Sequence, residues 1–116
     1  MSEPLINPDD WAMFKSMVDS ATLVELLDAY LEDSPQLIEQ MHAGVAAGDI
    51  EGVRRAAHSL KSNSASFGAN RLANVTRELE MIAKSGTLDG AAPKLAAVEA
   101  EYAQLLPRLL ELKNER

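Results

Sequence analysis

Apolar residues recur every three or four positions along most of the chain, a spacing that predicts amphipathic α-helices. No segment has the pattern of a strand. Two short connections, at Gly48-Asp49 and between Gly68 and Asn70, predict antiparallel neighbours. We therefore expect an all-α protein, an up-down four-helix bundle with a short extra N-terminal helix.

Capping residues and prolines mark the first two helices and the last one. Asn7 can cap a short helix that begins at the following proline and packs across the end of the bundle. Thr22 and Glu25 have capping-box spacing for a second helix. Pro35 either separates two helices or kinks one long helix, and we favour one kinked helix because no polar turn separates the halves. Pro107 should kink the last helix or loosen its final turns.

Glycines and polar residues mark the remaining helix ends. Asp49 is expected to cap a third helix that continues to about Phe67 and stops at Gly68 in the left-handed conformation. Asn70 is expected to cap the fourth helix, and Asp89 to start the fifth.

Composition limits both the fold and the chemistry. A chain of 116 residues can bury one core but not two, so residues 1–116 are expected to form a single domain. The lack of cysteine excludes disulfides, thiolate nucleophiles and cysteine-based zinc sites. A formal net charge of −7 argues against nonspecific binding to nucleic acid.

The termini and the apolar runs bear on location. No apolar run has the length of a membrane span, and the N-terminal residues lack the pattern of a signal peptide. We therefore expect a cytoplasmic protein that does not enter the membrane. The initial methionine favours a free-standing protein over a domain cut from a larger kinase.

His58 lies where the helical pattern predicts a solvent-facing side chain. At about 100° of rotation per residue, the apolar stripe of this helix lies on the opposite side. That stripe consists of Val53, Ala57, Leu60, Ser64 and Phe67, of which all but Ser64 are apolar. Lys61 follows His58 by one turn and could reach an anion on the ring, while Arg54 precedes it by one turn and adds a second positive charge. Ala65, on the same side, is small enough to let another surface approach.

The string His58-Ser59-Leu60-Lys61-Ser62-Asn63-Ser64-Ala65-Ser66-Phe67-Gly68-Ala69 resembles the signature of histidine phosphotransfer (HPt) domains. The residues that match in register are His58, Leu60, Lys61, Ser64, Phe67 and Gly68. The resemblance is clearest over residues 23–110. It departs at Ser62, where the family usually has glycine; serine narrows the space beside the ring but can donate a hydrogen bond to a phosphoryl oxygen.

The resemblance implies a phosphorelay intermediate of two-component signalling. His58 would accept a phosphoryl group from the aspartate of a receiver domain and pass it to another receiver. The implied partners are response-regulator receiver domains and a hybrid sensor histidine kinase. The receiver would bring the Mg²⁺ ion, so the chain would need no cofactor or metal of its own. We expect a monomeric phosphocarrier without its own ATP-binding catalytic domain.

The resemblance also assigns roles around His58. Lys61 would offset the charge of the phosphoryl group, and Glu80, on the next helix, could accept a hydrogen bond from the second ring nitrogen. Ser62 and Glu80 are therefore expected to support the site. The residues expected to contact a docked partner are Arg54, Ala65 and Gly68.

Three other functions remain possible from the sequence. The chain could be a non-phosphorylated adaptor that binds receiver or kinase domains, although the intact His58 and Lys61 argue against it. A metal-binding bundle could use His42 and His58, but the paired Glu-x-x-His motifs of di-iron bundles are not present, and His42 is expected to be inert. An enzyme is disfavoured because the chain has no Gly-rich phosphate loop and no nucleophile-base-acid set.

Overall fold

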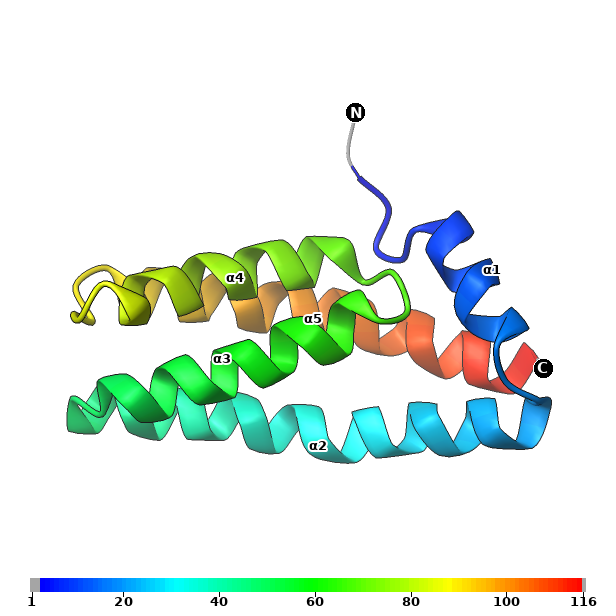
Figure 1. The fold of residues 1–116 in the computed structure, drawn as a ribbon, viewed down its shortest axis with the longest axis horizontal. Coiled ribbons are helices and arrows are strands. Elements are labelled where there is room, and N and C mark those ends of the chain that lie inside the picture. Colours follow the sequence, from blue (N-terminus) through cyan, green and yellow to red (C-terminus); the bar gives the residue numbers. More distant parts are fainter. Residues whose placement is uncertain (1–2, 116) are drawn as a thin grey trace.

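The computed structural model describes residues 3–115, which contain five helices and no strand. The helices are α1 (Pro8–Ser16), α2 (Ser20–Ala47), α3 (Ile50–Ala65), α4 (Asn70–Lys84) and α5 (Ala91–Glu115) (Figure 1). The all-α prediction is confirmed.

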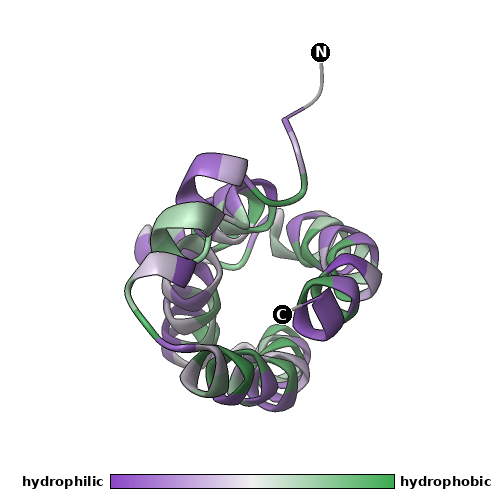
Figure 2. Cartoon of the chain, turned by 90° about the vertical axis from the view of Figure 1, so that its right-hand side faces the viewer, coloured by the Kyte–Doolittle hydropathy of each residue, from purple (hydrophilic) through white to green (hydrophobic). Residues whose placement is uncertain are grey.

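The four long helices lie around a common core, and α1 lies at one end of them (Figures 1 and 2). α3 packs between α2 and α4, and α5 contacts α4 and α2 on the other side. α3 therefore presents one face to the core and one face to solvent, flanked by its two neighbours. None of the described helices combines the length and the apolar character needed to span a membrane.

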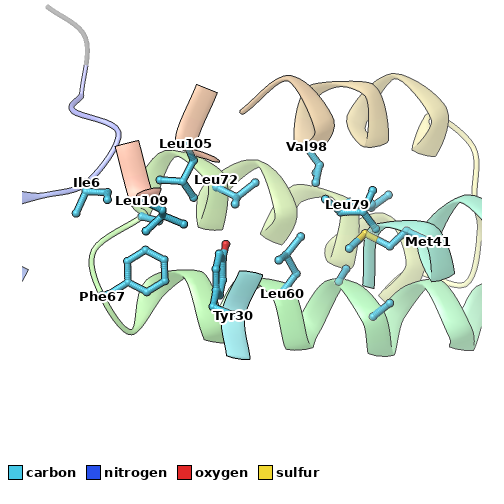
Figure 3. Packing of buried hydrophobic residues seen from close by; sticks show 14 of the residues in the cluster. Ile6, Tyr30, Met41, Leu60, Phe67, Leu72, Leu79, Val98, Leu105 and Leu109 are labelled. Atoms are coloured by element: carbon cyan, nitrogen blue, oxygen red, sulfur yellow. The ribbon is translucent and has the colours of Figure 1, made fainter. Parts of the chain in front are cut away.

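The core is mostly aliphatic, with aromatic rings gathered near α1. Leu60 of α3 and Leu79 of α4 are fully buried beside Met41 and Val98 (Figure 3). All five residues of the stripe predicted for the His58 helix are buried, which confirms its rotation. The aromatic cluster consists of Trp11, Phe14, Tyr30 and Phe67.

Several predicted helix ends are confirmed. The Asn7 side chain accepts hydrogen bonds from the first backbone N–H groups of α1, and Asp49 caps α3 by accepting from the N–H of Gly52 at 3.0 Å. Gly48, with φ of 73°, ends α2, and Gly68, with φ of 94°, forms the turn after α3. Only a residue without a Cβ adopts these values without strain.

Two helix ends differ from the prediction. α2 begins at Ser20, because the carboxylate of Asp19 accepts a hydrogen bond from the N–H of Thr22 at 2.7 Å and caps the helix before the expected capping box. α3 ends at Ala65 instead of near Phe67. The Ser66 hydroxyl donates to a backbone carbonyl three residues earlier, a local bond that competes with helix continuation.

The expected cap of α4 is wrong, and α5 begins later than expected. Asn70 is the first residue of α4, and its amide donates to the carboxylate of Asp10 at 3.0 Å, so it ties the α3–α4 turn to α1. α5 begins at Ala91 and not at Asp89, where the sequence predicts its start. The Asp89 N–H instead bonds the Thr87 hydroxyl at 3.0 Å within the preceding turn.

Both prolines lie inside helices that continue past them. α2 is one helix through Pro35, as favoured, and α5 continues past Pro107 to Glu115. Each proline leaves one carbonyl of the preceding turn without its usual donor. Both prolines face solvent, where water can replace that donor.

Candidate functional site

A single carboxylate of α4 holds two side chains of α3. Nδ1 of His58 lies 2.8 Å from Oε2 of Glu80, and Nζ of Lys61 donates to Oε1 of the same residue at 2.7 Å. His58 and Lys61 can share this acceptor because residues three apart on a helix lie on the same face. The hydrogen bond expected between Glu80 and the ring is present.

The three side chains differ in their exposure to solvent. The His58 side chain is 58% exposed, that of Lys61 is 28% exposed and that of Glu80 is only 2% exposed. The predicted exposure of His58 is therefore confirmed. The ring stands at the surface and is held from beneath by a buried acceptor.

The contact with Glu80 selects one form of the neutral ring. An ionised carboxylate can only accept hydrogen bonds, so the proton of a neutral imidazole must lie on Nδ1 of His58. Nε2 then carries the free lone pair. The ring thus has a fixed donor toward the core and a nucleophilic nitrogen on its other edge.

Glu80 remains ionised although it is buried. Burial alone would raise the pKa of this carboxyl, but the hydrogen bonds from Lys61 and His58 outweigh it and hold the pKa of Glu80 below its usual value. The site therefore contains a buried negative charge compensated mainly by the ammonium group of Lys61.

Arg54 is bound elsewhere than the sequence suggested. Its guanidinium donates from Nε to Oε1 of Glu51 at 2.8 Å, and a second bond from Nη2 reaches the other carboxylate oxygen. This pair lies three residues apart on α3, so the charge of Arg54 is already engaged within its own helix.

Ser62 and Ala65 are both exposed to solvent. The structure therefore leaves Ser62 accessible for its expected supporting role and Ala65 accessible for its expected contact with a docked partner.

The expected docking role of Gly68 is wrong. Gly68 is buried, and a Cβ added there would lie 2.8 Å from Cβ of Asp10 and 3.0 Å from the carbonyl oxygen of Asn7. Its own carbonyl accepts a hydrogen bond from the Asn7 N–H at 2.8 Å. The segment before α1 covers this glycine, so its role is to let α1 approach the α3–α4 turn.

Sequence reasoning missed two features of the molecule. Arg77 of α4 lines a groove with Lys61 between α3 and α4. Its spacing of three residues from Glu80 was the available signal, since it places both residues on neighbouring parts of one helix face. His42, expected to be inert, pairs through Nε2 with Glu99 of α5 at 2.8 Å.

No metal centre is found within residues 3–115, where no three histidine or acidic side chains gather as ligands would. The metal-binding alternative therefore has no set of donors in this part of the chain.

Comparison with known proteins identifies the family. The sequence model of the Hpt domain family matches residues 25–107 of this chain. The structure of histidine-containing phosphotransfer protein B from Pseudomonas aeruginosa PAO1 is similar with a TM-score of 0.91 at 29% sequence identity, and the match covers 99% of each chain. No curated protein sequence matches the chain.

Two plant structures share the fold at lower identity. A putative histidine-containing phosphotransfer protein from rice matches with a TM-score of 0.79 at 19% identity, covering 96% of this chain and 83% of its own. The maize histidine-containing phosphotransfer protein ZmHP2 matches with a TM-score of 0.80 at 20% identity, covering 96% and 86%. The chain belongs to the Hpt domain family and is a phosphorelay intermediate of two-component signalling.

Proposed function

We propose that His58 is the phosphoryl-accepting residue, which receives the group from the aspartate of one receiver domain and passes it to another. The observation that carries the proposal is the exposed imidazole whose Nδ1 contacts the buried carboxylate of Glu80. This contact leaves Nε2 as the nucleophile on the accessible edge of the ring.

The transfer step balances with the groups at hand. The Nε2 lone pair of His58 attacks the phosphorus of an aspartyl phosphate, so an N–P bond forms and the P–O bond to aspartate breaks. The bonding electrons leave with the aspartate carboxylate. The ring keeps its Nδ1 proton and becomes positively charged, and the negative charge of Glu80 stabilises that state. The same step in reverse passes the phosphoryl group onward.

Lys61 and Ser62 would support the phosphoryl group. The Lys61 ammonium is partly exposed one turn from His58, so it can offset negative charge that arrives on the ring. The exposed Ser62 hydroxyl can donate a hydrogen bond to a phosphoryl oxygen. Among the expected docking residues, Ala65 keeps its proposed role, and Arg54 does so only if a partner competes with Glu51.

The partners follow from this chemistry. Receiver domains and a histidine kinase exchange the phosphoryl group with the chain, and we propose that the kinase is a hybrid sensor kinase and that Mg²⁺ is bound by the receiver. We propose a monomeric carrier in which one domain, an up-down four-helix bundle with α1 added, has no ATP-binding catalytic part. Because the phosphoryl groups originate from ATP, we also propose a cytoplasmic location.

The test is transfer from a phosphorylated receiver domain. The wild-type protein should acquire an acid-labile label, and His58→Gln should abolish it while the thermal midpoint changes little, because the ring is 58% exposed. His42→Gln is the matched control and should be labelled like the wild type. A labelled His58→Gln variant would contradict the assignment, and a wild type that no receiver labels would favour the adaptor.

A further inference from the structure

We propose that Arg77 is a specificity-determining residue that pairs with a carboxylate of the receiver domain docked over His58. The proposal rests on the proposed function and adds a second point of contact to it. Nothing in the sequence pattern around His58 includes this residue, because it lies on α4.

The first support is the groove itself. It has a volume of about 500 Å³ and lies between α3 and α4. Lys61 borders it and also contacts Glu80, so the groove is continuous with the site. Small side chains line its length, namely Ser62, Ala65 and Ala73, so a partner surface can approach the backbone closely.

The second support is that several cations of α3 and α4 are already paired within the protein. Arg54 is paired with Glu51, Lys61 with Glu80, and Arg71 with Glu101 at 2.9 Å. Arg77 is exposed and forms no ion pair or side-chain hydrogen bond with any of residues 3–115. It is therefore the arginine of the groove whose guanidinium is available to a partner.

The third support is the chemistry of the receiver domain that would cover the groove. Phosphoryl transfer requires the donor to cover the exposed edge of His58, so the partner must extend over the neighbouring helices. A receiver active site that binds Mg²⁺ is acidic because this ion takes oxygen ligands, so the receiver face that covers His58 is expected to be acidic, and the carboxylate that pairs with Arg77 would lie at the rim of that face. A planar guanidinium matches a carboxylate with two parallel hydrogen bonds.

The helix on the other flank of α3 is acidic, although Arg55 of α3 borders the groove on that side. α2 carries several acidic residues and no lysine or arginine. An acidic partner surface is therefore attracted to Arg77 on the α4 side and repelled by the carboxylates of α2, so Arg77 would set the orientation of the receiver as well as its affinity. His58 does not line the groove, which places the contact at the rim of the partner and away from the phosphoryl group.

The experiment measures transfer from a panel of phosphorylated receiver domains of the same organism, as a function of receiver concentration and salt. Arg77→Glu should raise the receiver concentration at half-maximal rate about tenfold at low salt for the receivers that the wild type prefers, with the saturated rate unchanged. The difference should shrink at high salt. Arg108→Glu, on α5, is the matched control and should behave like the wild type.

A second readout separates the receiver from the phosphoryl group as the partner of Arg77. Labelling by the small phosphodonor phosphoramidate, and the half-life of the labelled protein, should be the same in Arg77→Glu and wild type. A shortened half-life would show that Arg77 binds the phosphoryl group and would overturn the proposal. Wild-type transfer kinetics in Arg77→Glu with every receiver would also overturn it, whereas a wild type that no donor labels would overturn the proposed function itself.

Discussion

Two histidines of this protein each contact a glutamate of a neighbouring helix at the same distance, but their surroundings differ. His42 of α2 and Glu99 of α5 are 2.8 Å apart, with side chains 53% and 44% exposed. His58 of α3 and Glu80 of α4 are also 2.8 Å apart, but the glutamate is 2% exposed. The exposure of the histidine is similar in the two pairs, so the acceptor makes the difference.

A buried acceptor changes what the pair can do. Exposed ion pairs contribute only about 0–1 kcal/mol, because water competes for both partners and the side chains must be ordered. Glu80 cannot turn to water, so its oxygens stay on Lys61 and His58, and the ring is oriented as a result. Among residues 3–115 no lysine or arginine pairs with Glu99, which is free to leave His42 for solvent.

The sharpest way to test this comparison is to remove each glutamate. Glu80→Ala should lower the free energy of unfolding by about 1–3 kcal/mol, because it leaves a cavity and removes the acceptor of Lys61 and His58. Glu99→Ala should cost less than about 0.5 kcal/mol. Urea denaturation measures both values.

The same two variants test ring orientation. Glu80→Ala should slow transfer from a phosphorylated receiver several-fold under conditions where the variant is folded, since both ring nitrogens then compete for the proton. Glu99→Ala should transfer normally. Equal losses of stability in the two variants would show that burial of the acceptor is unimportant.

Lys61 provides a second contrast, with the exposed pair of Lys94 and Glu78. The side chains of that pair are 43% and 54% exposed, and its nitrogen and oxygen lie 2.6 Å apart. Lys61→Ala should slow phosphoryl transfer about tenfold, less than the loss of a donor in an enclosed site because His58 is open to water. Lys94→Ala should leave transfer unchanged.

The half-life of phosphohistidine completes this test. It should shorten in Lys61→Ala if the ammonium offsets the phosphoryl charge, and both variants should remain folded by circular dichroism. An unaffected Lys61→Ala variant would mean that this lysine serves only to neutralise Glu80.

The outward direction of His58 was predictable because it depends on one helix. The stripe of Val53, Ala57, Leu60 and Ser64 fixes the rotation of α3, and all four residues are buried. The contact with Glu80 needed more, since residues 22 positions apart meet only through the packing of two helices. It was suggested by resemblance to a family, not by periodicity.

Other features depended on choices that the sequence leaves open. Asp19 and Thr22 are both good caps, and the two signals lie within one turn, so the earlier cap could not be distinguished from the later one. The groove beside Arg77 depends on how α3 and α4 are positioned relative to each other. The spacing of residues along a single helix does not predict that relative position. The burial of Gly68 required knowing where α1 would lie.

The smallest expected effect concerns acid stability. The pKa of Glu80 lies below its ordinary value of 4.5, because bonds from Lys61 and His58 outweigh the opposing effect of burial. The unfolded chain therefore takes up a proton at higher pH than the folded chain. The resulting stability is fully present above pH 4.5 and is lost as the pH falls through the lowered value of the folded state.

Glu80→Gln removes this titration while keeping the size of the side chain. Its free energy of unfolding should be lower than that of the wild type at about pH 7, and the gap should narrow between about pH 5 and pH 3. The variant should still lose some stability in acid, because the pKa of Asp19 is lowered by its bond to the Thr22 N–H and that of Glu51 by Arg54. Urea denaturation across this range measures the gap. A gap that stays constant or widens in acid would show that the Glu80 carboxylate gains nothing from its two partners on α3, and the contrast with Glu99 would then have no electrostatic basis.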